Sequence, residues 1–227
     1  MTRLRQLRDL GVMPVPTEQL VAYEALADRL AAPRRVAAEY VASTCPDAPS
    51  VVDVGSFQGE LLEAFLDALP RASGQWTDAA DSSLPIARRR LARFGDRVTY
   101  RIGCPGRDIS DGTVPKGTEI LATSWISSHR PAARLPEVYS AAAELLAAGG
   151  WLVHLEHVGF ANRAVERRVL AAHAQLHVSW EGPPPHHDEP IATLDEHLGA
   201  LRAAGLAQID VPWRSLATCL LVARRPG

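Results

Sequence analysis

Two segments in the first half of the chain carry residue types that could hold a small polar ligand. The run Val51-Val-Asp-Val-Gly-Ser-Phe-Gln-Gly59 is apolar and β-branched, contains two glycines, and opens into the amphipathic stretch 60–69. A glycine just past a strand lets the backbone turn sharply and approach a ligand closely. The free N–H groups of a following helix favour an anionic or polar group. A lone Gly-x-x-x-Gly is weak evidence, because many strand–helix turns contain one without binding anything.

An acidic residue follows this turn at a useful distance. Asp78 comes 23 residues after Gly55, at the end of the next predicted strand. A carboxylate there can accept two hydrogen bonds from the hydroxyls of an adenosine ribose. Asp81 is the nearby competitor, and either acid could instead cap a helix.

Histidines supply the candidate general bases, since an imidazole ordinarily titrates near neutral pH. Ligands of open α/β sheets lie beyond the carboxyl ends of the strands, which favours His129 and His157 over His154. His186 and His187 follow three prolines and are expected to contact substrate from a lid.

A metal site is the weaker interpretation of the same residues. His154 and Glu156 alternate along a strand and share one face, whereas His157 turns to the other. No tight ligand spacing is present, so no metal is predicted.

The elements that position these residues follow from hydrophobic patterns. Strands are predicted over 50–55, 74–78, 98–102, 119–124, 151–155, 207–211 and 216–223. Helices are predicted over 17–31, 33–45, 60–69, 84–91, 135–147, 161–175 and 194–204. Gly149 and Gly150 are expected to end the helix over 135–147.

Strands that alternate with helices indicate an α/β fold with a mostly parallel sheet covered on both faces. The last two strands are separated only by residues 212–215, which favours a hairpin and hence one antiparallel strand. Residues 1–47 are predicted to form an N-terminal helical lid, and 48–227 an α/β domain with a cap inserted at about 158–190. The lid and cap should enclose a partly apolar pocket, with Trp125 at a strand end as the best lining candidate.

In series, these segments resemble the class I S-adenosylmethionine-dependent methyltransferases. Residues 51–59 look like the glycine-rich first motif of that family, and Trp76-Thr-Asp78 looks like the second. Residues 119–125 resemble the fourth-strand motif, and 145–158 resemble the region with a glycine pair, a strand and Glu-His. The match covers about residues 48–225, and its specificity lies in the order of the motifs.

The resemblance implies a Rossmann-like sheet of order 3-2-1-4-5-7-6 and S-adenosyl-L-methionine as the cofactor. Gly55, Ser56 and Gly59 would contour its methionine end, Asp78 would hold the ribose, and Cys104 or Asp108 would flank the adenine. The motifs also place Asp53 and Ser124 in the cofactor site.

Two departures from the family pattern bear on this expectation. Phe57 stands where the first motif usually has a glycine, so its ring must point away or reshape the pocket. Gly103-Cys104 replaces the usual Gly-Asp after the third strand. A member of the fold that has lost methyl transfer, such as a cyclase-like or cofactor-binding regulatory protein, therefore stays open.

Composition narrows the classes of function. The net charge of -2 and pI of about 6.4 argue against sequence-independent binding of nucleic acid, which needs an excess of basic residues. The chain has three scattered cysteines, no apolar run of membrane-spanning length and no secretory signal, which predicts a cytoplasmic protein.

The predicted activity is methylation of an oxygen or nitrogen of a small molecule, such as a secondary metabolite. A homodimer is left open, and no membrane partner is expected. A nicotinamide-dependent oxidoreductase is the remaining alternative, but it would need a Gly-x-Gly-x-x-Gly that residues 55–59 lack.

Overall fold

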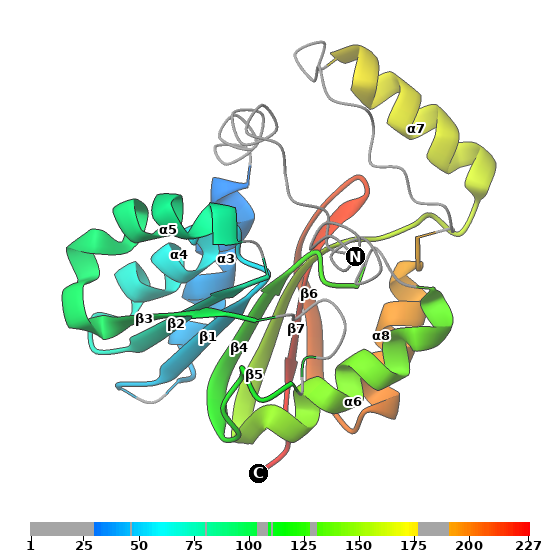
Figure 1. Ribbon diagram of the computed structural model, residues 1–227. Coiled ribbons are helices and arrows are strands. Elements are labelled where there is room, and N and C mark those ends of the chain that lie inside the picture. Colours follow the sequence, from blue (N-terminus) through cyan, green and yellow to red (C-terminus); the bar gives the residue numbers. More distant parts are fainter. Residues whose placement is uncertain are drawn as a thin grey trace, which may run out of the picture.

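The structure is a computed structural model that describes residues 30–45, 47–79, 81–103, 109, 111–127, 131–176 and 191–227 (Figure 1). The strands are β1 Ser50–Val54, β2 Ser73–Asp78, β3 Val98–Ile102, β4 Thr118–Ser124, β5 Leu146–His157, β6 Ala207–Ser215 and β7 Thr218–Arg224. The α-helices are α3 Ala31–Ala42, α4 Glu60–Ala68, α5 Leu84–Leu91, α6 Leu135–Leu145, α7 Arg163–Leu176 and α8 Leu194–Ala203. Short 3-10 turns lie at Asp81–Ser83, Ala92–Arg97 and Ala132–Arg134.

The strands form one sheet of order β3-β2-β1-β4-β5-β7-β6, which confirms the predicted topology. The pairs from β3 to β5 are all parallel. The last strand, β7, lies between β5 and β6 and runs antiparallel to both. The order of the parallel strands reverses between β1 and β4, the point at which open α/β sheets bind ligands.

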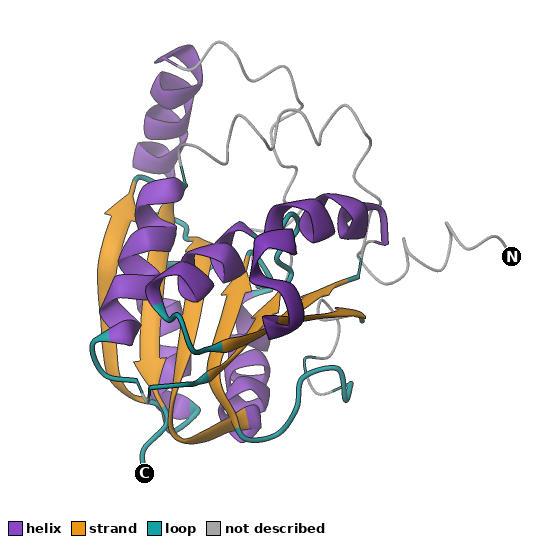
Figure 2. Ribbon diagram, turned by 90° about the vertical axis from the view of Figure 1, so that its left-hand side faces the viewer, coloured by secondary structure: helices purple, strands orange, loops and turns teal. Residues whose placement is uncertain are grey.

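Helices cover both faces of this sheet (Figures 1 and 2). Helices α3, α4 and α5 lie on one face, and α6 and α8 on the other. Successive strand residues alternate between the two cores: in β5, Trp151 and Val153 pack with the α3–α4 side and Leu152 with the α6–α8 side. This alternation explains the continuous apolar runs, because both faces of the strands are buried.

Local sequence features account for two of the helices. Helix α4 buries Leu61, Leu62, Phe65 and Leu66 on one stripe. Helix α8 starts with a capping box, in which the Thr193 side chain accepts from the Glu196 N–H and the Glu196 side chain accepts from the Thr193 N–H.

Two predicted boundaries are wrong. Gly149 and Gly150 do not end the helix that precedes them, because α6 stops at Leu145 and both glycines lie within β5. A Cβ on Gly150 would lie 3.0–3.1 Å from the carbonyl oxygens of Ala147, Glu119 and Thr118, so the neighbouring backbone requires the glycine. Residues 212–215 belong to β6, and the hairpin turns instead at Leu216 and Ala217.

The predicted lid and cap are described only in part. Helix α3 covers most of the second predicted helix, while residues 17–29 of the first lie outside the described residues. In Figures 1 and 2, α7 stands beyond one end of the sheet, apart from the helices on its faces. The division into a lid, an α/β domain and an inserted cap stays a prediction.

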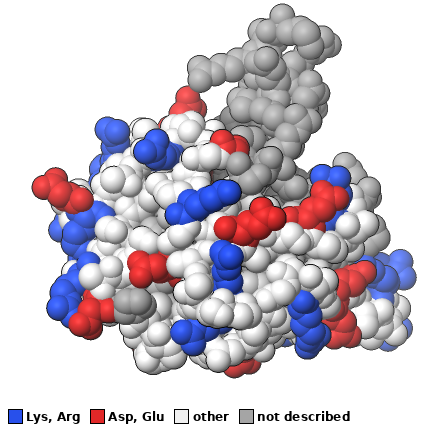
Figure 3. All heavy atoms as spheres, turned by 90° about the horizontal axis from the view of Figure 1, so that it is seen from below, with Lys and Arg blue, Asp and Glu red and all other residues white. Residues whose placement is uncertain are grey.

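Charged side chains on the surface are mixed in sign. On the face shown in Figure 3, basic and acidic side chains of the described residues are interspersed. No helix in the described part of the chain combines the length and apolar character needed to span a bilayer.

Candidate functional site at the carboxyl ends of β1, β2, β4 and β5

The turn from β1 into α4 adopts the left-handed backbone conformation three times. Gly55 has φ 71°, Phe57 has φ 48° and Gly59 has φ 85°. At Gly55 a Cβ would lie 3.1 Å from both the Ser124 carbonyl oxygen and the Ile126 side chain. The first glycine is therefore required by both its conformation and the close approach of the β4 end.

Side chains of β2 hold the middle of this turn. The Phe57 N–H donates to Asp78 Oδ2 at 2.9 Å, and the Trp76 indole N–H donates to the Phe57 carbonyl oxygen at 3.1 Å. Both backbone polar groups of Phe57 are thus bonded to residues of the neighbouring strand. This clamp keeps a bulky residue in a conformation that ordinarily costs about 1–2 kcal/mol.

Asp53 supports the turn from below and is fully buried. Its Oδ2 accepts from the Ser56 hydroxyl and, at 3.1 Å, from the Leu62 N–H. Its Oδ1 meets no hydrogen-bond donor within the described residues. Burial raises the pKa of the Asp53 carboxyl to about 7, against the lowering effect of those two hydrogen bonds.

A side chain at position 59 would point into the protein interior. A Cβ there would lie 2.9 Å from Leu91 Cδ1 and 3.4 Å from Trp76, so this glycine lets α4 pack against α5 and β2. The structure thus gives Asp53 and Gly59 supporting positions rather than places on the wall of a cavity.

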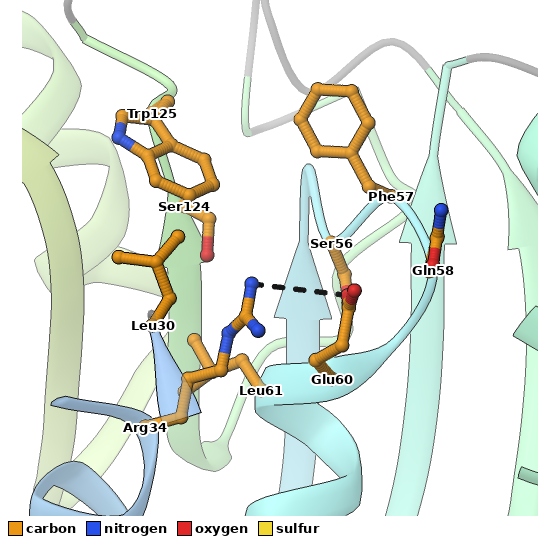
Figure 4. Close-up of a pocket in the computed structure, with 9 residues that line it drawn as sticks. All are labelled: Leu30, Arg34, Ser56, Phe57, Gln58, Glu60, Leu61, Ser124 and Trp125. Carbon is orange, nitrogen blue, oxygen red and sulfur yellow. Dashed lines mark ion pairs between the residues drawn. The ribbon is translucent and has the colours of Figure 1, made fainter. Parts of the chain in front are cut away.

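A small hollow opens between the turn, the start of α3 and the end of β4 (Figure 4). Its cavity volume is about 10 Å³, room for about one water molecule. It is lined by Leu30, Arg34, Ser56, Phe57, Gln58, Glu60, Leu61, Ser124 and Trp125. In Figure 4 the rings of Phe57 and Trp125 stand on opposite sides above the guanidinium of Arg34. The Phe57 ring therefore contributes to the wall of a hollow that is too small for a nucleoside.

Aromatic side chains gather at the ends of β4 and β5. Trp125 has φ 52°, and its backbone N–H donates to the Leu155 carbonyl oxygen at 2.9 Å. Its ring centroid lies 5.5 Å from that of His157 and 6.4 Å from that of Phe57. Thr218 Oγ1 lies 3.2 Å from His157 Nδ1, so a side chain of β7 helps to orient this imidazole.

A buried carboxylate ties the two strand ends together. Glu156 Oε2 accepts from the Ser127 N–H at 2.8 Å and the Ser127 hydroxyl at 2.6 Å. It also lies 2.9 Å from His154 Nε2, and Glu156 Oε1 accepts from the His157 N–H at 2.7 Å. Burial alone would raise the pKa of the Glu156 carboxyl, but the contacts with His154 and Ser127 outweigh it and hold that pKa well below its usual range.

The network of polar side-chain contacts extends from Glu156 and His154 to residues of the helices α6 and α8. Tyr139 Oη lies 3.2 Å from His154 Nδ1 and 2.5 Å from His197 Nδ1. Burial lowers the pKa of His197 to about 4 and raises the pKa of Tyr139 well above its ordinary value. His154 thus serves the core, whereas His157 lies on the other side of the sheet beside Trp125, as the alternation predicted.

The fold brings several of the predicted site residues to one edge of the sheet. Gly55, Ser56, Asp78, Ser124, Trp125 and His157 all lie at or just beyond the carboxyl ends of β1, β2, β4 and β5. Cys104, Asp108, His129, His186 and His187 lie outside the described residues. No group of three His, Cys, Asp or Glu side chains suited to a metal ion occurs in the part of the chain that the structure describes.

Two residues of this region were not anticipated. Arg34 lines the hollow and Ser127 meets Glu156. A signal for Arg34 existed, because it precedes the buried Ala37, Ala38 and Val41 by three, four and seven residues and so lies on their face of α3. A charged residue on an otherwise apolar helix face is a candidate for a buried role.

Comparisons with solved structures identify the fold. The apo structure of the S-adenosylmethionine-dependent methyltransferase SibL matches 94% of this chain and 60% of its own, at 18% identity and a TM-score of 0.68. An O-methyltransferase family protein from Burkholderia thailandensis matches 90% of this chain and 59% of its own, at 22% identity and a TM-score of 0.65. An O-methyltransferase family 2 protein from Planctomyces limnophilus, in complex with apigenin, matches 99% of this chain and 62% of its own, at 19% identity and a TM-score of 0.65.

The chain thus spans about 60% of the length of these structures. Comparisons with protein-family models and with curated proteins found no match. The chain has the fold of the class I S-adenosylmethionine-dependent methyltransferases, as the order of its strands also indicates.

Proposed function

We propose that the protein is an S-adenosylmethionine-dependent methyltransferase that methylates an oxygen or nitrogen atom of a small molecule. One observation carries this proposal: in a methyltransferase fold, the glycine turn after β1 is bonded directly to a carboxylate at the end of β2. The antiparallel β7 also distinguishes this sheet from the classical dinucleotide-binding order 3-2-1-4-5-6. The nicotinamide-dependent alternative therefore has less support.

The donor set at this edge suits an adenosyl compound that carries an amino acid. Asp78 would accept from the ribose hydroxyls, and Gly55, Ser56 and Ser124 would lie along the methionine end. The position after β3 that would flank the adenine falls at 104–108, outside the described residues. The bound cofactor would supply a methyl group made electrophilic by its sulfonium.

The chain's own residues would align the acceptor and take its proton. Trp125 offers an apolar face at the end of β4, and the His157 imidazole beside it is oriented through Thr218. An imidazole in this place can accept the proton of a hydroxyl or amine as the methyl group transfers. Alignment of the reactants supplies about 7–11 kcal/mol in favourable cases, so the rings that fix the acceptor matter as much as the base.

The Asp78 assignment is testable with single substitutions. Asp78→Ala should weaken the binding of S-adenosylhomocysteine at least about 10-fold, because each hydrogen bond to a charged group contributes about 1.5–3 kcal/mol. Asp78→Asn keeps an acceptor for the Phe57 N–H and should bind more tightly than Asp78→Ala. Isothermal titration calorimetry measures all three proteins.

Asp81→Ala is the matched comparison, since Asp81 is exposed and starts the next turn. Its affinity should equal that of the unchanged protein. Weakened binding in Asp81→Ala together with unchanged binding in Asp78→Ala would show that Asp81, and not Asp78, contacts the ribose.

A second candidate function is a methyltransferase-fold protein that binds the cofactor, or a substrate, without methyl transfer. The Phe57 ring on the wall of a hollow of about 10 Å³ favours it. Incubation with methyl-labelled S-adenosylmethionine and a panel of hydroxylated and amine acceptors separates the two functions. An enzyme moves the label to an acceptor and releases S-adenosylhomocysteine, whereas binding without label transfer to any acceptor supports the second candidate.

A further inference from the structure

A chain of buried polar side chains leads from the ends of β4 and β5 to the helices on one face of the sheet. Its four members, called here the Glu156 network, are at most 1% exposed: Glu156, His154, Tyr139 and His197. They are joined in that order by contacts of 2.9, 3.2 and 2.5 Å. Buried charged groups are costly unless they are paired, and apolar side chains of similar size often serve stability as well. Stability alone therefore gives no reason for four polar side chains at this place.

The carboxylate of Glu156 fixes the chain where it leaves both strands. Its Oε2 accepts from the backbone N–H of Ser127 at 2.8 Å, three residues past the end of β4. Its Oε1 accepts from the backbone N–H of His157 at 2.7 Å, at the last residue of β5. The backbone N–H of Trp125 also donates to the carbonyl oxygen of Leu155 at 2.9 Å. These bonds attach the chain after β4 to the end of β5 and set the Trp125 ring beside that of His157, with centroids 5.5 Å apart.

The Glu156 carboxyl is ionised although it is buried. Burial raises its pKa, but the contacts with His154 and Ser127 outweigh this effect and hold the pKa well below its usual range. Three further titratable groups face it from the elements packed around β5, and burial raises the pKa of the first two and lowers that of the third: Tyr139 on α6, Cys219 on β7 and His197 on α8. All three are thus neutral near pH 7. The negative charge of Glu156 therefore acts on the imidazoles of His154 and His157.

We propose that Glu156, held by His154 and Tyr139, is a positioning residue that keeps the His157 imidazole and the Trp125 ring in place for the acceptor. The carboxylate acts on the base through two effects. Its hydrogen bond fixes the backbone of His157, and its charge favours the imidazolium that forms when His157 takes the proton of the acceptor. His154 and Tyr139 lie on the other side of the sheet from that imidazole and act through Glu156. This inference rests on the proposed function and adds the residues that orient its base.

The His157 imidazole can be titrated by NMR spectroscopy of the full chain without any acceptor. Its ring signals are identified by their loss in His157→Gln. Glu156→Gln keeps the size of the side chain and removes its charge, so the midpoint of the His157 titration should fall by about half a pH unit or more. With an acceptor that the labelled cofactor methylates, kcat should fall about 10-fold or more, and KM should change much less.

Glu119→Gln is the matched control. Glu119 Oε2 accepts from the backbone N–H of Ser50 at 2.7 Å and from the Ser50 hydroxyl at 3.2 Å. Ser127 offers the same two donors to Glu156, but Glu119 lies near the amino end of β4, at the end of the parallel strands opposite to His157. The substitution should lower stability and leave both the His157 midpoint and kcat unchanged.

Two substitutions of His154 keep the test decisive if Glu156→Gln fails to fold. His154→Gln still offers an N–H to the Glu156 carboxylate, whereas His154→Leu offers none. His154→Leu should therefore lower both the His157 midpoint and kcat, and His154→Gln should change them less. Equal changes in the two folded variants would overturn the proposal.

The outcomes distinguish the role of the Glu156 network from the proposed function. An unmoved His157 midpoint in a folded Glu156→Gln, or an equal movement in Glu119→Gln, would overturn the role of Glu156. A lower midpoint with unchanged kcat would show that His157 is not the base, which contradicts the proposed function. An unchanged protein that methylates no acceptor also contradicts the proposed function, and the titration then still decides whether Glu156 acts on the imidazole.

Discussion

Phe57 occupies a backbone conformation that glycine adopts without steric cost. In Phe57→Gly, relief of the left-handed strain recovers about 1–2 kcal/mol, while the freedom of glycine in the unfolded chain costs about 0.5–1 kcal/mol. From these two effects the free energy of unfolding should therefore change by no more than about 1.5 kcal/mol. Removing the ring should widen the hollow and strengthen S-adenosylhomocysteine binding several-fold. Urea denaturation and calorimetry measure the two effects.

Leu216→Gly is the control for this substitution. Leu216 also has a positive φ, of 53°, and is 40% exposed in the turn between β6 and β7. The change should affect stability to a similar degree and leave ligand affinity untouched. A fall in affinity on Phe57→Gly would mean that the ring supports the ligand rather than restricting it.

Asp53 should make stability depend on pH. Burial raises its folded-state pKa from the ordinary 3.8 to about 7, so the folded chain binds this proton more tightly than the unfolded chain does. Its contribution to the free energy of unfolding is therefore largest below pH 3.8 and is lost as the pH rises toward 7. The slope in this range is at most about 1.4 kcal/mol per pH unit.

Asp53→Asn removes this titration. The stability of the variant should vary less between pH 4.5 and about 7 than that of the unchanged protein, in urea denaturation at each pH. Parallel curves for the two proteins would show that Asp53 is already ionised in the folded state at low pH.

At the scale of elements, β5 depends on Gly150. A Cβ there would lie 3.0–3.1 Å from three backbone carbonyl oxygens. Backbone atoms of a sheet cannot shift as easily as the end of a flexible side chain. Gly150→Ala should lower the free energy of unfolding by about 1–3 kcal/mol, as overpacking of a well-packed interior does. Thermal and chemical denaturation report the loss.

Gly199→Ala in α8 is the opposite case. Apart from the adjacent backbone of α8 itself, no atom of the described residues lies within 4 Å of the position a Cβ would take. Because alanine is the better helix former, the substitution should stabilise the protein by up to about 1 kcal/mol. Equal effects of the two alanines would show that the crowding at Gly150 is relieved by a shift of β5.

The glycine pair Gly149-Gly150 shows which features of the fold local sequence patterns do not predict. The apolar runs of β1 and β4 and the amphipathic stripe of α4 predicted those elements to within one residue. A glycine pair after a helical pattern signals a helix end, yet α6 ends earlier and β5 already begins at Leu146, which pairs with Thr118. That pairing is a contact with a distant strand, which local patterns do not report.

For the whole molecule, the parallel topology explains which site residues could be anticipated. Gly55 and Asp78 end adjacent strands, so the strand order alone brings them together. Arg34 and Ser127 reach the same region from a helix and a loop whose packing is set by tertiary contacts. Their positions followed only from the folded arrangement, although the apolar face shared by Arg34, Ala37 and Val41 was visible in the sequence.

The insertion of β7 between β5 and β6 also affects how the sheet assembles. Among the described strands β6 pairs with β7 alone, so it cannot join the sheet until β7 is present. During synthesis from the amino end, β5 therefore keeps an open edge until the strand after β6 has left the ribosome. An unpaired strand edge is a template for association with other chains, so a nascent molecule stalled between β6 and β7 would be the form most exposed to aggregation.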